Sequence, residues 1–138
     1  MDLILIRVGL AIFAILGSIH LIYTLLDLSD PKRFVPADRS VLAGMQASKT
    51  RFPSVHSYWR SSLGFHLSHS LGLIIFALIF VTLSFVAAGA LFTPALMIIM
   101  AGTGTVYAVL SHYFWFSIPL MGSILGTGLI GLGFSVHG

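Results

Sequence analysis

Histidine is the residue of this chain best suited to chemistry in apolar surroundings. Four of the six histidines lie within long apolar segments, namely His20, His66, His69 and His112. A neutral imidazole donates one hydrogen bond and accepts another, and it also binds zinc, copper or iron. Ionisable residues are costly in such segments and often mark binding sites or proton relays. These four histidines are therefore the first candidates for a functional site.

The elements that would position them are membrane-spanning helices. Of the 138 residues, 57% are hydrophobic and only 8% are charged, whereas about a quarter of a soluble domain is charged. A helix needs about 20 apolar residues to cross a bilayer. Four segments meet or approach that length, at about 3–26, 58–86, 93–114 and 117–136. We predict one all-α domain over residues 1–138, a four-helix transmembrane bundle in which Thr93 caps the third helix.

The basic residues predict the topology. Six of the seven lie in or beside the first loop: Lys32, Arg33, Arg39, Lys49, Arg51 and Arg60. The positive-inside rule places this loop in the cytoplasm and both termini outside, as in a bacterial inner membrane. Within the loop, Asp38 can cap a short interfacial helix through Val41, Leu42 and Met45. So few basic residues indicate membrane lipids with anionic headgroups as partners, and no nucleic acid.

Helical spacing brings further polar residues beside the histidines. His20 lies roughly 9 Å inside the cytoplasmic end of the first span, and His66 and His69 lie roughly 10 to 17 Å inside the second. Because the helices alternate in direction, all four histidines fall in the same half of the bundle, with His112 on a third-helix line of Ala101, Thr105 and Ala108. The predicted ligand-binding residues are His20, Tyr23, Thr24, His66, His69, Ser70 and His112.

Three kinds of ligand fit these residue types. A transition metal would take imidazoles, with His20 and His69 as tentative ligands, and the same pair could hold a haem. A lipophilic molecule such as a quinone would use histidine and tyrosine for its polar head. No cysteine is present, and Asp27 and Asp30 fit turn formation better than acid-base catalysis. The sequence therefore leaves open whether the protein is an enzyme.

A structural role is the main alternative. Each imidazole could simply hydrogen-bond Tyr23, Thr24 or Ser70 and hold helices together. Gly122, Gly126 and Gly133 lie on one side of the fourth span and allow close helix contact. The chain would then be an accessory subunit docked on a larger membrane complex, or a homo-oligomer. A transporter would also need to oligomerise. Arg7, near the outer end of the first span, is expected to reach lipid headgroups.

Three stretches carry a resemblance to known proteins. GSIHLIYT in the first span, RFVPAD in the loop, and Trp59 followed by GFHLSHSLG in the second span resemble an uncharacterised family of small four-helix bacterial integral membrane proteins. The resemblance covers the first half of the chain and implies the four-helix topology but no activity. It also implies that Asn often replaces His66, which would favour His20, His69 and Ser70 as site residues.

Overall fold

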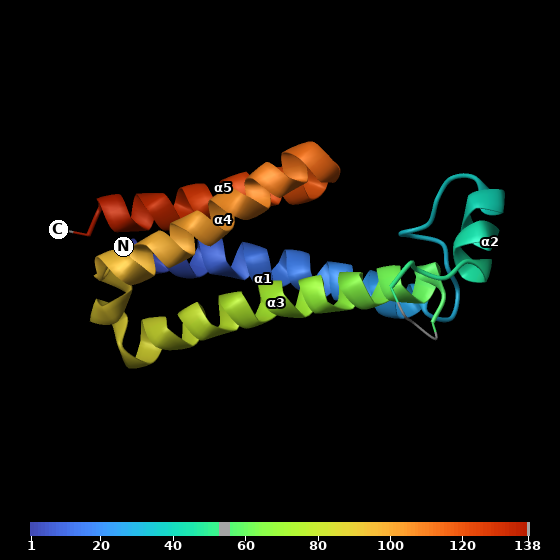
Figure 1. Ribbon diagram of the computed structural model, residues 1–138. Helices are drawn as coiled ribbons and strands as arrows, with labels where there is room; N and C mark the ends of the chain where they lie inside the picture. Colours follow the sequence, from blue (N-terminus) through green and yellow to red (C-terminus); the bar gives the residue numbers. More distant parts are fainter. Residues whose placement is uncertain (53–55, 138) are drawn as a thin grey trace. The chain divides into compact units, whose positions relative to one another are not determined.

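The computed structural model describes residues 1–52 and 56–137. The helices are α1 (Asp2–Asp27), α2 (Arg39–Ala47), α3 (Tyr58–Val86), α4 (Pro94–Phe114) and α5 (Ser117–Ser135), with a short 3₁₀ helix, η1 (Ala88–Phe92), between α3 and α4 (Figure 1). The described residues form no strand, and their extended backbone pairs only in one bridge, between Lys49 and Ser57. The predicted all-α fold with a short helix in the first loop is confirmed.

Four of these helices are those of a membrane protein. By length and composition, α1, α3, α4 and α5 can each cross a bilayer. Their ends lie within about two residues of the predicted ends, because proline, glycine and polar residues interrupt the apolar runs there. The chain is therefore an integral membrane protein.

Local signals explain where two of the helices begin. Pro94 occupies the first turn of α4, where its missing N–H costs nothing. Thr93 is the N-cap residue of α4 as predicted, but its hydroxyl donates to the carbonyl of Ala90 at 2.7 Å and makes no capping hydrogen bond. At α2 the predicted cap is present, since the Asp38 carboxylate accepts the backbone N–H of Ser40 at 2.7 Å.

The chain forms two compact units that both draw on α1 and α3. The first unit comprises residues 1–16 and 73–138, and the second comprises residues 17–72. The first unit holds the apolar core, in which α4 and α5 run side by side (Figure 1). Its fully buried side chains include Ile6, Leu10 and Phe13 of α1, Met100 of α4 and Ile130 of α5. The Phe13 ring meets Phe76 edge to face at 5.9 Å, a favourable aromatic geometry.

Glycines let α1 and α5 approach closely within the first unit. A Cβ atom added to Gly9 would lie 2.6 Å from the carbonyl oxygen of Gly126, and one added to Gly126 would lie 3.1 Å from that of Gly9. Gly122 lies against Leu16, and Gly133 against Ile6. The glycine side of the fourth span therefore packs on α1. It is occupied within the chain and is not a free surface for docking on another subunit.

The partners of Arg7 differ from the prediction that its side chain reaches lipid headgroups. Its guanidinium donates to the hydroxyl of Ser84 at 2.9 Å and to the Ser84 carbonyl at 2.8 Å. The same group lies over the Phe85 ring, 3.8 Å from the centroid, in a cation–π contact. Arg7 therefore links α1 to the end of α3, because a charged group in apolar surroundings gains more from fixed partners than from exposure to lipid.

The close approach of α1 and α5 gives a paired test. Gly9→Ala should lower stability by about 1–3 kcal/mol, because the new methyl group meets backbone that cannot move aside. Gly128→Ala, on α5 with open space around it, should be neutral or stabilising because alanine favours helices. Thermal unfolding in detergent, followed by circular dichroism, measures both. Equal unfolding temperatures for the two variants would contradict the packing.

The cap of α2 should depend on pH. Hydrogen bonds from the Ser40 hydroxyl and backbone N–H hold the pKa of the Asp38 carboxyl below its ordinary value. A lowered pKa stabilises the helix above the unfolded value of about 3.9 and ceases to do so as pH falls through the folded value. Hydrogen-exchange protection of the α2 amides should therefore fall on acidification. Asp38→Ala should lose that protection at every pH, and wild-type protection in this variant would refute the cap.

Candidate functional site

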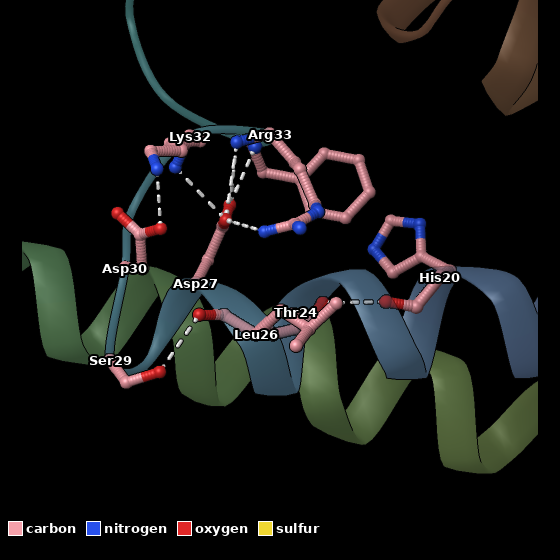
Figure 2. Close-up of polar contacts among 9 residues, drawn as sticks. His20, Thr24, Leu26, Asp27, Ser29, Asp30, Lys32 and Arg33 are labelled. Atoms are coloured by element: carbon pink, nitrogen blue, oxygen red, sulfur yellow. Dashed lines mark hydrogen bonds and ion pairs between the residues drawn. The ribbon is translucent and has the colours of Figure 1, made fainter.

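The second unit is organised by one buried carboxylate. Asp27, the last residue of α1, is 0% exposed. Its oxygens accept the backbone N–H groups of Lys32, Arg33 and Phe34 at distances between 2.7 and 3.1 Å. The Arg33 guanidinium adds an ion pair at 3.4 Å (Figure 2). A buried charge needs this many partners, so the turn after α1 is fixed with Phe34 at a defined position.

Phe34 lies flat on two of the predicted histidines. Its ring centroid is 4.4 Å from that of His20 at an interplanar angle of 24°, and 5.2 Å from that of His66 at 14°. All three rings are half-buried. The Asp27 turn thus places one loop residue against imidazoles from two different helices.

The two imidazoles also contact each other. His20 Nε2 lies 3.1 Å from His66 Nδ1, a hydrogen bond in which one ring donates and the other accepts. The facing nitrogens therefore share one proton, and each ring keeps a second nitrogen for further chemistry. His69 meets His20 edge to face at 5.5 Å, and Phe65 stacks on His69 at 6.2 Å. Three of the predicted histidines thus lie in contact.

Two predicted hydroxyl groups bond to their own helices. The Thr24 hydroxyl donates to the His20 carbonyl at 2.8 Å, and the Ser70 hydroxyl donates to the His66 carbonyl at 2.7 Å. Both residues are fully buried. This back-bonding to the carbonyl four residues earlier is common for Ser and Thr in helices. Thr24 and Ser70 therefore shape the backbone that carries the histidines, and their protons are not the donors we expected for a histidine or a ligand.

Tyr23 lies at the outer edge of the same group. The side chain is 44% exposed. Its ring is 6.3 Å from that of Phe34, and the Arg33 guanidinium lies 5.6 Å above it. The Tyr23 ring thus lies beside Phe34 and carries the Arg33 guanidinium on its face, and both the phenol and the guanidinium are hydrogen-bond donors.

His112 does not belong to this group. It lies on α4 in the first unit, where it is exposed and contacts the Tyr113 ring at 4.9 Å. The predicted line through Thr105 and His112 is not the buried side of α4, whose buried residues are Met100, Gly104 and Ser111. The predicted line is therefore displaced from the buried side of α4 by one residue, which is about 100° around the helix.

The imidazoles do not fit a metal or haem centre. Among the residues described, no group of three or more His, Cys, Asp or Glu side chains could hold a metal ion, whereas zinc sites use at least three protein ligands. A haem bound by His20 and His69 would have to lie between their rings. Those rings touch edge to face, and His20 is bonded to His66 as well. The arrangement suits hydrogen bonding and stacking instead.

The sequence did not identify Phe34 or Arg33 as site residues. Both lie in the turn-rich stretch SDPKRFVPADRS, where no periodicity indicates which side chain points inward. The sequence does contain one signal for Phe34. It is the single aromatic residue of that stretch, and it follows shortly after Asp27 at the end of the first span. The role in turn formation predicted for Asp27 is confirmed, and the same turn also places Phe34.

Two aspartates provide a matched test of the turn. Asp27→Asn should lower stability by about 1–3 kcal/mol, because a neutral amide cannot satisfy three N–H groups and a guanidinium in a buried position. Hydrogen exchange at the amides of residues 32–34 should accelerate. Asp30→Asn removes an exposed ion pair with Lys32 and should change stability by less than about 0.5 kcal/mol. Equal effects of the two substitutions would contradict the role of Asp27.

Comparison with models of protein families, with curated proteins and with solved structures finds no match to this chain. The most distinctive polar feature of the described residues is in the second unit, where His20, His66 and His69 lie in contact beside the Phe34 ring, which a buried carboxylate holds in place.

Proposed function

We propose that the second unit binds the flat polar head of a lipophilic molecule, such as a quinone, on the imidazoles of His20, His66 and His69. The observation that carries the proposal is the Phe34 ring, which lies nearly parallel to two hydrogen-bonded imidazoles from separate helices. That stacking surface accepts a planar ring. Phe34 marks the position that the ligand's head takes.

The chemistry of the rings matches such a head. A quinone carbonyl accepts a hydrogen bond from an imidazole N–H, and a hydroquinone hydroxyl donates to an imidazole lone pair. Neutral histidines supply both kinds of group. The exposed Phe65 ring, 65% accessible and stacked on His69, provides an apolar flank along which a hydrocarbon tail would pass into lipid.

Phe34 and the ligand would compete for one place. The Phe34 centroid is only 4.4 Å from that of His20, which is ordinary contact between two rings. A third ring cannot enter that space. A ligand that stacks on His20 and His66 therefore displaces Phe34. Without ligand, Phe34 fills the binding position.

A purely structural role, in which the histidines only link helices by hydrogen bonds, explains fewer of the observed contacts than a binding site does. The His20–His66 bond would suffice to link α1 to α3. It leaves unexplained the third imidazole against His20 and the buried carboxylate that holds Phe34 over the pair. A binding site accounts for all three features.

Helix length and charge support a position near the headgroups of the inner leaflet. α1 has 26 residues and α3 has 29, against the roughly 20 that a bilayer core requires. His20 is seven residues from the end of α1, roughly 10 Å along the axis. Six of the seven Lys and Arg residues belong to the second unit. In the proposed topology this unit faces the cytoplasm of a bacterial cell, with both termini outside.

A fluorescence titration tests the proposal. Trp59 is buried in the second unit, and Trp115 is the only other tryptophan. In a Trp115→Phe background, a short-chain ubiquinone should quench Trp59 saturably. His69→Ala should weaken binding about tenfold, the loss of one hydrogen bond of about 1.4 kcal/mol. Phe34→Ala should strengthen binding, because it removes the competing ring.

His112→Ala is the matched control, because this histidine is exposed on α4. It should leave the titration unchanged. The proposal fails if quenching does not saturate, or if Phe34→Ala and His69→Ala bind ubiquinone with the wild-type affinity. The structural alternative predicts that His20→Ala and His66→Ala lower the unfolding temperature while ubiquinone leaves it unchanged in every variant.

A further inference from the structure

We infer that α2 and the basic residues around it form a surface that docks on anionic phospholipid headgroups. This surface, called here the α2 surface, comprises Arg39, Val41, Leu42, Met45, Lys49 and Arg51. The inference is independent of the ligand proposed for the histidines.

The apolar side of α2 is only partly covered within the described residues, since Leu42 and Met45 are half-buried and Val41 is exposed. Val41, Leu42 and Met45 are three or four positions apart or adjacent, which places them on one side of the helix. No residue of α2 is buried, and Val41 is 49% exposed. A short helix with an exposed apolar side and basic neighbours is typical of helices that lie in the interface of a membrane.

The charges around α2 are unbalanced. The second unit contains three carboxylates, and each is engaged: Asp27 in the turn, Asp30 with Lys32, and Asp38 at the cap of α2. Within the described part of the chain, Arg39, Lys49, Arg51 and Arg60 form no ion pair. Six basic residues against three acidic ones give the unit a net charge of +3. This excess attracts an anionic surface.

The chain connections hold α2 close to such a surface. Residues 28–38 join it to the end of α1, and residues 48–57 join it to the start of α3. Both neighbouring helices are long and apolar enough to cross the bilayer. The headgroups of that bilayer are therefore always within reach. Their negative charge complements the α2 surface, which favours lipid over a protein partner.

The absence of cysteine allows a clean test. Met45→Cys places a single label on the apolar side of α2, and Ala43→Cys places one on the opposite side. Each variant carries an environment-sensitive fluorophore in nanodiscs of phosphatidylcholine, with or without phosphatidylglycerol. The label at position 45 should shift to shorter wavelength and resist iodide quenching when phosphatidylglycerol is present. The label at position 43 should remain accessible in both lipids.

Removing basic side chains from the α2 surface provides a second test of the inference. Replacing Arg39, Lys49 and Arg51 by Gln should abolish the difference between the two lipid compositions at position 45, while the helix cap at Asp38 stays intact. The inference is overturned if the label at position 45 is equally accessible in both lipids. It is also overturned if that label is shielded equally in detergent and in both nanodiscs, because protein would then cover the apolar side.

Discussion

The second unit depends on the burial of the Asp27 carboxylate. A charge removed from water requires compensation, and the backbone N–H groups of Lys32, Arg33 and Phe34 provide it together with one guanidinium. Three consecutive amides can converge on one carboxylate only if the chain reverses after α1. That reversal lays Phe34 on His20 and His66. One electrostatic requirement thus builds the aromatic cover of the histidines.

The two units are held together by different kinds of interaction. The first unit packs apolar side chains and glycines, and its one intramembrane cation, Arg7, bonds to Ser84. The second unit is polar, with three contacting imidazoles and all of the chain's excess charge. A unit built for helix packing alone would not need that polarity. The contrast supports a division between a scaffold and a site.

Most of the fold follows from local signals, and part of the site does not. The limits of the helices could be predicted because apolar runs end at proline, glycine and charge, and Asp38 caps α2 as expected. Depth and spacing predict that His20, His66 and His69 share one half of the bundle, but they do not predict that His20 bonds to His66. Arg7 was misassigned because Ser84 is 77 residues away. The buried side of α4 differs from the predicted line through His112 because a shift of one position turns a side chain by about 100°. Phe34 lies in an irregular turn, where no repeating pattern shows which side chain faces inward.

In the proposed site, the Phe34 ring occupies the place that a planar ligand would take. Solid-state NMR in bilayers can measure the contact between the Phe34 ring and the His20 imidazole directly. We expect this contact to be present without ligand and to be lost at saturating ubiquinone. A Phe34–His20 contact that persists unchanged beside bound ubiquinone would contradict this expectation.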